Sequence, residues 1–321
     1  MNSDLKSDRT FGQLAPNCRI AIVGDVHDQW DDGDAAALRH LEVDLVLLVG
    51  DFGNESVEIV RAIAQLDLPK AAIFGNHDAW FTATSWGRGL RTHTEDRVEQ
   101  QLDLLSDCHV GFGKLDFHHL GLTVVGSRPF SWGGPNWRNR RFYKQRFGIK
   151  GFEESTAKIV AAAAAAAYPT LILLGHGGPS GLGDQPEDIC GKDWKPMGGD
   201  YGDPDLTAAI HQIRATGKQI PLVAFGHMHH SLRHTQSRLR TRLEQDTSDT
   251  VYLNAASVPR IIPTPSGVRR NFSLVTLAAG RVTQASLVWI DESFGISEQI
   301  LFPIPAPPET QLAAEQTELV I

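Results

Sequence analysis

Five short apolar runs divide the chain, and each run is closed by a glycine with a polar residue beside it. An apolar run of this kind predicts a buried β-strand that delivers its polar end to the surface. The five runs are Ile20–Val23, Leu45–Val49, Ala71–Phe74, Thr170–Leu174 and Pro221–Phe225. Because the carboxyl ends of parallel strands collect the functional loops of a sheet, we expect the polar residues after these glycines to meet in one place.

Helical patterns separate the first three runs. Asp34 can cap a helix that continues to about Glu42, and apolar positions with a helical period mark a second helix from about Glu55 to Leu66. The resulting β-α-β-α-β order predicts a parallel sheet. Three further helices are expected at about 95–105, 152–167 and 205–215.

The remaining strands are expected in two groups. Two short strands, Leu115–His118 and Leu122–Gly126, precede an aromatic and basic stretch without a clear period. Three later strands look antiparallel and are expected to close a second sheet: Val251–Asn254, Phe272–Leu277 and Val282–Ile290. Between the two groups lies 177–204, a loop rich in glycine and proline, and a loop of this length is uncommon in a compact domain unless it serves a site.

Composition limits the class of protein. The 321 residues are 41% hydrophobic and 21% charged, as in a soluble globular protein. The net charge of −8 argues against a chain dominated by nucleic-acid binding. Three scattered cysteines, no evident signal peptide and no apolar run of the ~18 residues that span a bilayer make a cytoplasmic location the expectation.

One folded domain is expected over residues 18–300. It follows a polar leader, 1–17, and precedes a proline-rich tail, 301–321, both expected to be disordered. Within the domain, 79–150 is expected to be a variable insert.

The polar residues at the strand ends have the chemistry of metal ligands. They are Asp25, His27, Asp51, Asn76, His176, His227 and His229. Carboxylate, imidazole and carboxamide donors suit Mn, Fe, Zn or Ni, and they suit Cu(I) or an iron–sulfur cluster poorly. Seven ligands are too many for one tetrahedral zinc ion, but they suit two metals that share a carboxylate. Two such metals polarise a phosphoryl oxygen and activate water near neutral pH. His77 lies next to a ligand but points the other way, so it can protonate a leaving oxygen.

These blocks resemble the signature of the calcineurin-like metallophosphoesterases. That signature runs Asp-x-His, Gly-Asp, Gly-Asn-His-Asp/Glu, Gly-His and Gly-His-x-His. The chain carries all five blocks in this order: Asp25-Val26-His27, Gly50-Asp51, Gly75-Asn76-His77-Asp78, Gly175-His176 and Gly226-His227-Met228-His229. The resemblance spans about residues 19 to 260, and Asn254-Ala255-Ala256-Ser257 also resembles the Asn-x-x-Ser segment that often follows the last block.

The resemblance implies a fold and a set of roles. The fold is an α/β protein with two packed mixed β-sheets flanked by helices, a four-layer αββα sandwich. Two divalent metal ions share Asp51 as a bridge, and His77 acts as the general acid with Asp78 beside it as a further catalytic residue. One metal is held by Asp25, His27, Asp51 and His229, and the other by Asp51, Asn76, His176 and His227.

The implied activity is hydrolysis of a phosphodiester or a small phosphomonoester. A metal-bridging hydroxide attacks phosphorus in line while His77 protonates the leaving group. Two alternatives are a protein phosphatase and a metal-binding scaffold without turnover. The protein phosphatases carry Gly-Asp-x-Val-Asp-Arg-Gly around the bridging aspartate, but this chain reads Gly-Asp-Phe-Gly-Asn-Glu, with Asn54 in place of a common acid. The complete set of ligands favours an enzyme over a scaffold.

The aromatic and basic stretch is the candidate for substrate binding. Arg138, Arg140 and Arg141 are expected to bind a second anionic group of the substrate, since guanidinium groups match phosphate oxygens in pairs. A solvated basic face is the alternative. Trp132 and Trp137 could stack on a base or sugar, or anchor a loop.

Overall fold

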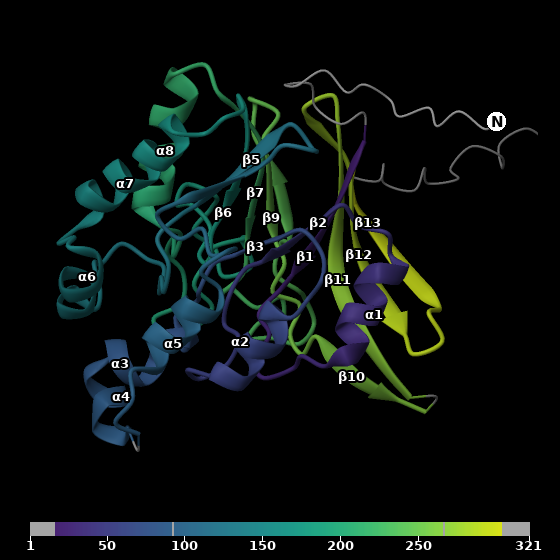
Figure 1. Ribbon diagram of the computed structural model, residues 1–321, viewed down its shortest axis with the longest axis horizontal. Helices are drawn as coiled ribbons and strands as arrows, with labels where there is room; N and C mark the ends of the chain where they lie inside the picture. The colour runs from purple at the N-terminus through teal and green to yellow at the C-terminus, as the bar shows by residue number, and fades with distance from the viewer. Residues whose placement is uncertain (1–16, 92, 266, 304–321) are drawn as a thin grey trace, which may run out of the picture.

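The computed structural model describes residues 17–91, 93–265 and 267–303, and these residues form two mixed β-sheets (Figure 1). The first sheet has seven strands in the order β13-β12-β11-β1-β2-β3, with β10 paired to β11. Its strands are β1 (Cys18–Val23), β2 (Leu45–Leu48), β3 (Lys70–Ala72), β10 (Ile261–Thr264), β11 (Gly267–Ala278), β12 (Arg281–Asp291) and β13 (Ile296–Phe302).

The second sheet has six strands in the order β4-β5-β6-β7-β9-β8. They are β4 (Lys114–Phe117), β5 (Leu122–Gly126), β6 (Thr170–Leu174), β7 (Gln219–Phe225), β8 (Leu243–Gln245) and β9 (Val251–Asn254). The five strands expected to lead into the site are therefore divided between the two sheets, with β1, β2 and β3 in one and β6 and β7 in the other.

The first three strands form the predicted parallel array. Helix α1 (Asp32–His40) connects β1 to β2, and α2 (Val57–Ala64) connects β2 to β3. In the register of the sheet, Ile20 lies opposite Leu45 and Leu47 lies opposite Ala71. Every residue of β2 is buried, as expected for a parallel strand that is covered on both faces.

Alternate residues of these strands enter two different cores. Ile20 and Ile22 pack between the two sheets with residues of β6 and β7, whereas Ala21 and Val23 face the outer core with α1 and α2. The outer face of the second sheet is covered by α7 (Phe152–Ala164) and α8 (Pro204–Ala215), on the side away from β11 and β12 (Figure 1). The layers thus run helix, sheet, sheet, helix, and the predicted four-layer sandwich is confirmed.

Residues 79–150, expected as a variable insert, contribute β4 and β5 to the second sheet. They also contain four helices, α3 (Trp80–Ala83), α4 (Ser85–Leu90), α5 (Arg97–Leu104) and α6 (Arg140–Phe147), which follow a 3-10 turn, η1 (His77–Ala79). Helix α6 was not expected. It buries Phe142 and Tyr143 against other aromatic rings, a tertiary contact that does not show as a period in the sequence.

The expected antiparallel arrangement of the late strands is confirmed for β11 and β12, but their expected sheet and the expected pairing of β9 are wrong. β9 pairs in parallel with β7 in the second sheet, whereas β11 and β12 belong to the first sheet, where β11 is antiparallel to β1. An alternating pattern identifies a strand but not its partner, so these partners could not be chosen from the sequence. The expected tail also began too early, because β13 extends through Phe302. Residues 1–16 of the leader and 304–321 of the tail lie outside the described residues.

The cap of α1 differs from the prediction. Asp31 is the N-cap, and its Oδ1 accepts a hydrogen bond of 2.8 Å from the Gly33 amide. Asp34 is buried at the third helical position, where its Oδ2 accepts from the Asp31 amide at 3.0 Å and completes a capping box. Its Oδ1 accepts a hydrogen bond of 2.6 Å from Arg260 Nη2. Arg260 is fully buried and also donates to the Gln29 carbonyl at 2.6 Å. This buried pair fixes the segment between β1 and α1, which carries Asp25 and His27.

No helix within the described segments is long and apolar enough to cross a membrane. Cys18, Cys108 and Cys190 are unpaired and buried, as the scattered spacing predicted. Burial raises the pKa of the Cys108 thiol to about 11, so this thiol is protonated near neutral pH.

Candidate active site

The seven predicted metal ligands come together at the carboxyl ends of five strands. Asp25, Asp51 and Asn76 follow β1, β2 and β3, while His176 follows β6 and His227 follows β7. His27 and His229 each lie two residues beyond another ligand. The site therefore lies where the edges of both sheets meet, and its donors come from positions up to 204 residues apart, since 229 − 25 = 204.

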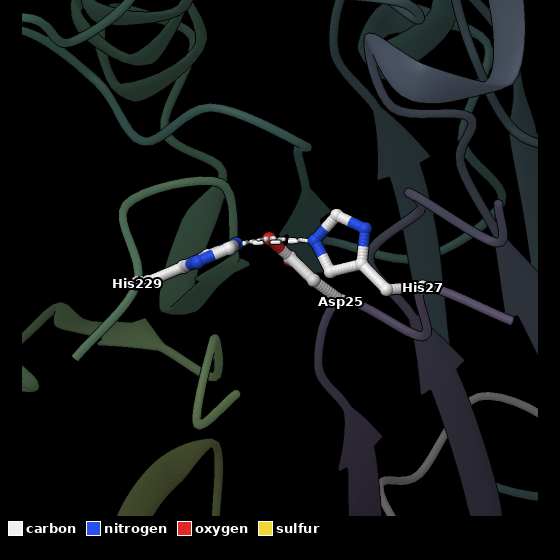
Figure 2. A group of neighbouring side chains, drawn as sticks. All are labelled: Asp25, His27 and His229. Atoms are coloured by element: carbon white, nitrogen blue, oxygen red, sulfur yellow. Dashed lines mark hydrogen bonds and ion pairs between the residues drawn. The ribbon is translucent and has the colours of Figure 1, made fainter. Parts of the chain in front are cut away.

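The first group of donors consists of Asp25, His27 and His229. Figure 2 shows the Asp25 carboxylate between the two imidazole rings. The Nε2 atoms of His27 and His229 are 3.1 Å apart, and Asp25 Oδ2 lies 3.3 Å from His229 Nε2 and 4.0 Å from His27 Nε2. Three side chains from two sheets thus direct one donor atom each toward a common point.

The second group consists of Asp51, Asn76, His176 and His227. His176 Nε2 is 3.3 Å from Asp51 Oδ1, 3.0 Å from Asn76 Oδ1 and 3.2 Å from His227 Nδ1. His176 is fully buried, and its Nδ1 lies 2.8 Å from the Val49 carbonyl oxygen. Because a carbonyl oxygen accepts a hydrogen bond, Nδ1 carries the proton of the neutral imidazole. Nε2 is then unprotonated, and its lone pair can bind a metal.

Asp51 connects the two groups. Its Oδ1 faces His176, while its Oδ2 lies 3.9 Å from His27 Nε2 and 4.0 Å from His77 Nε2. The backbone amide of His77 donates to Oδ1 at 2.9 Å and holds the carboxylate in this orientation. One buried carboxylate therefore presents an oxygen to each group, the arrangement that a bridging ligand requires.

Three residues of the site have a backbone conformation that is unfavourable for residues other than glycine. His27, Asp51 and His227 have φ angles of 44°, 51° and 69°, in the left-handed region. Each such residue costs about 1–3 kcal/mol and persists only where its surroundings fix it. Close packing adds a second constraint, because a Cβ at Gly75 would lie 2.2 Å from Asp51 Oδ1 and 2.5 Å from His176 Cε1.

A further asparagine holds the last histidine pair in place. Asn254 is buried at the end of β9, and its Nδ2 donates to the Met228 carbonyl at 2.7 Å. Met228 lies between His227 and His229, so this bond fixes the loop that supplies both histidines. His230, the next residue, is buried and pairs with the Asn254 carbonyl.

The protonation states of His227 and Asp25 suit metal binding. Burial lowers the pKa of His227 to about 3, and the neighbouring His176 contributes to the decrease, so His227 is neutral at physiological pH. Burial alone would raise the pKa of Asp25, but the hydrogen bond with His229 and nearby imidazoles hold that pKa well below its ordinary value. Ionised carboxylate and neutral imidazole are the forms that bind a metal.

The donor set fits two divalent cations. Three clusters of metal-capable side chains occur among the described residues, and in each the donor atoms lie within 4.8 Å of one another: Asp25, His27 and His229; His27, Asp51 and His77; and Asp51, His176 and His227. Nitrogen and oxygen donors in these proportions suit Mn, Fe, Zn or Ni.

His77 lies beside the ligands but has different partners. Its Nδ1 is 2.7 Å from Asn54 Oδ1, and its ring stacks on Trp80 with a centroid distance of 4.8 Å and an angle of 16°. Because a carboxamide oxygen accepts, Nδ1 is the donor and Nε2 faces Asp51. Burial lowers the pKa of His77 below its ordinary value.

Asp78, expected among the catalytic residues, is placed beneath the site. Its side chain is fully buried and accepts hydrogen bonds from the amides of Phe52 at 2.8 Å and Gly75 at 2.7 Å. Burial and the nearby Asp51 charge raise the pKa of Asp78 well above its usual range. These bonds join the loops after β2 and β3, so Asp78 positions the ligands and does not line the cavity.

A cavity of about 480 Å³ opens over the ligands. Its floor includes Asp51, Asn76, His77, His227 and His229, and its walls include Trp80, Trp132, Arg138, Trp194, Tyr201, Arg233 and Arg240. The cavity therefore contains the predicted acid and most of the predicted ligands.

The structure separates the three arginines expected to bind substrate. Arg138 lines this cavity. Arg140 and Arg141 are exposed and lie outside it, and Arg141 instead lines a hollow beside α4 and α5. Trp132 lines the cavity, whereas Trp137 packs on Tyr143 and anchors its loop.

Several cavity residues were not found from the sequence. Trp80 lies directly behind His77, and Arg233 and the pair Trp194 and Tyr201 form part of the wall. The long glycine-rich loop 177–204 was expected to serve the site. That expectation was the only indication from the sequence that Trp194 and Tyr201 could line the cavity. In the sequence, Asn54 stands where an acidic residue is common. In the structure it is the hydrogen-bond partner of the His77 ring.

Comparison with known proteins identifies a family. A sequence profile described as calcineurin-like phosphoesterase matches residues 18–231. A search of curated proteins finds no significant match.

Solved structures of low sequence identity resemble the chain. A metallophosphoesterase from Sphaerobacter thermophilus is 16% identical, with 83% of this chain and 86% of that chain covered and a TM-score of 0.34. An archaeal phosphodiesterase is 12% identical, with 88% and 99% covered and a TM-score of 0.31. PhoD is 10% identical, with 91% and 70% covered and a TM-score of 0.47. Similarity at this level carries no argument about substrate.

We predict that Gly75→Ala weakens metal binding by roughly tenfold or more, because overpacking a site costs about 1–3 kcal/mol. Isothermal titration of Mn²⁺ into metal-free protein measures the effect. Gly89→Ala is the matched control, since a Cβ there meets nothing within 4 Å. Equal affinities in the two variants would show that the space between Asp51 and His176 does not matter for binding.

Proposed function

Because the chain belongs to the calcineurin-like phosphoesterase family, we propose that it hydrolyses phosphoesters with two divalent cations bound at the seven strand-end ligands. The observation that carries the proposal is the orientation of Asp51, whose two oxygens face two separate groups of donors. The complete donor set and the acid beside it favour an enzyme over a scaffold that only binds metal.

The proposed assignment of ligands follows the two groups. Asp25, His27 and His229 would hold one cation, Asn76, His176 and His227 would hold the other, and Asp51 would contact both. When bound, two divalent cations supply Lewis acidity toward phosphoryl oxygens and lower the pKa of water. The chain contributes fixed donor geometry and a cavity whose wall includes the aromatic residues Trp80, Trp132, Trp194 and Tyr201.

His77 is the proposed general acid. Its Nδ1–H bond to Asn54 and its stacking on Trp80 fix the ring, so that Nε2 faces the cavity floor. Nε2 would deliver a proton to the oxygen that leaves phosphorus, and the bond between that oxygen and phosphorus would break as the proton arrives. Asn54 is uncharged, so it orients the ring without the charge that an aspartate would add.

The cavity supports a small substrate. About 480 Å³ is in the range of small-molecule sites, and aromatic side chains form part of the wall above the ligands. We therefore propose a phosphodiester or a small phosphomonoester, ahead of a phosphoprotein. The unpaired thiols are consistent with the predicted cytoplasmic location, which stays a prediction.

We expect metal-reconstituted protein to hydrolyse members of a panel of mono- and diesters, and Asp51→Asn to abolish that activity while the fold stays cooperative. The asparagine keeps the shape of the side chain but loses the charge needed to bridge two cations. Turnover and elemental analysis of both proteins are the measurements. Asp67→Asn, at an exposed position outside the cavity, is the control. Full activity of Asp51→Asn with two metals bound would disprove the bridge.

We predict that His77→Asn slows hydrolysis strongly for basic leaving groups and weakly for nitrophenolate. A general acid contributes about 10²–10⁴-fold, and that help is needed only where the leaving oxygen is basic. A series of aryl and alkyl esters gives the dependence of kcat on leaving-group pKa. His211→Asn, exposed on α8, is the control. The same loss across the whole series would assign His77 to positioning.

A further inference from the structure

Two arginines at the cavity wall have no acidic partner. Arg138 and Arg233 are both exposed, and among the residues that the structure describes neither has a carboxylate oxygen within 4.0 Å. The third arginine of the cavity, Arg240, is buried and lies 3.3 Å from Asp193 Oδ1. Arg138 and Arg233 are thus the arginines of the cavity that are free to receive an anion.

Each of these arginines contacts an aromatic residue of the long loop between β6 and α8. Arg138 Nη2 donates to the Tyr201 hydroxyl at 3.1 Å, and the guanidinium of Arg233 lies over the Trp194 ring, 5.3 Å from its centroid. Trp194 and Tyr201 contact each other edge to face, with centroids 4.7 Å apart. Arg138, Tyr201, Trp194 and Arg233 therefore form one connected rim of the cavity.

Buried contacts fix this rim. Asp193 Oδ2 accepts a hydrogen bond of 2.7 Å from the backbone amide of Arg233, and Arg240 in turn donates to the Asp188 carbonyl at 2.9 Å. On the other side, the amide of Gly134 donates to the Tyr201 carbonyl at 2.8 Å. These bonds hold the backbones of Arg233 and Tyr201 in place, while the two guanidinium groups stay exposed and without a carboxylate partner.

The rim is separate from the donors that form the cavity floor. Among the described contacts, neither Arg138 nor Arg233 bonds to any of the seven ligand residues. The cavity of about 480 Å³ is much larger than a single phosphate group, so a substrate anchored at the floor would extend to the wall.

We propose that Arg138 and Arg233 form an anion subsite that binds a second, phosphate-like group of the substrate, distinct from the phosphoryl group that is cleaved. This proposal rests on the proposed phosphoesterase function. Guanidinium groups bind phosphate oxygens through paired, charge-assisted hydrogen bonds. Here the Tyr201 hydroxyl accepts a hydrogen bond from Arg138, and the Trp194 ring lies beneath Arg233. Arg233 takes the role that the sequence suggested for Arg140 and Arg141. The preferred substrate is therefore a phosphoester with a further anionic group.

Two substrates that differ by one phosphate provide the test. They are the 5′-(p-nitrophenyl phosphate) of thymidine and the same compound with an added 3′-phosphate. In both, water adds to the 5′-phosphorus and the bond to nitrophenolate breaks, so the leaving group and the cleaved bond are identical. We expect the wild-type protein to have the higher kcat/KM with the 3′-phosphate, mainly through a lower KM.

Single substitutions assign the preference. Arg138→Ala and Arg233→Ala should each lower the ratio of the two kcat/KM values about tenfold, the effect of losing one charge-assisted contact. Arg140→Ala and Arg238→Ala should keep the wild-type ratio, because neither residue lines the cavity and Arg238 is paired with Glu187. All four side chains are exposed, so the fold of each variant should be intact.

Two results would overturn the subsite. Equal losses of kcat/KM with both substrates would mean that the arginines bind the cleaved phosphoryl group, and wild-type kcat/KM values with both substrates would make them a solvated face. If the wild-type protein cleaves neither compound, the proposed diester activity fails, and the subsite is decided by binding. Isothermal titration of metal-free protein with thymidine 3′,5′-bisphosphate and with thymidine 5′-monophosphate should then show preference for the bisphosphate, and loss of that preference in the two variants.

Discussion

The structure depends on two carboxylates that are removed from water without a cationic side chain beside them. Asp25 and Asp51 are 0% and 2% exposed, and among the described residues no lysine or arginine nitrogen lies within 4.0 Å of either. A buried ion without a partner is strongly unfavourable. Backbone amides and imidazoles offset part of that cost, and two divalent cations would offset the rest. The donors that would hold these cations come from the ends of five strands, which belong to both sheets.

The rest of the site follows from this constraint. Left-handed backbone at His27, Asp51 and His227 turns the chain sharply after each strand and directs the donor atoms inward. Such strain persists because buried contacts fix the loops, including the hydrogen bonds of Asp78 and Asn254. Residues with no contact to a substrate are therefore needed to keep the ligands in position.

The ligands could be predicted because their signal is local, whereas other features depend on distant partners. An apolar run, a glycine and a donor lie within a few residues of one another at each strand end. The N-cap of α1 is Asp31 and not Asp34, and the pairing of Asp34 with Arg260, 226 residues away in sequence, leaves no local signal. Similarly, Arg233 and Arg140 are both arginines in polar segments, and nothing in the local sequence tells them apart. Only the packing of the long loop and α6 brings Arg233 to the cavity and leaves Arg140 outside it.

The central claim is that Asp51 joins two cations across the edges of the two sheets. Anomalous diffraction from crystals grown with Mn²⁺, with data collected on both sides of the manganese absorption edge, tests it most directly. The account predicts two peaks, one among Asp25, His27 and His229 and one among Asn76, His176 and His227, each within coordination distance of a different Asp51 oxygen. A single peak, or two peaks of which one does not contact Asp51, would contradict it.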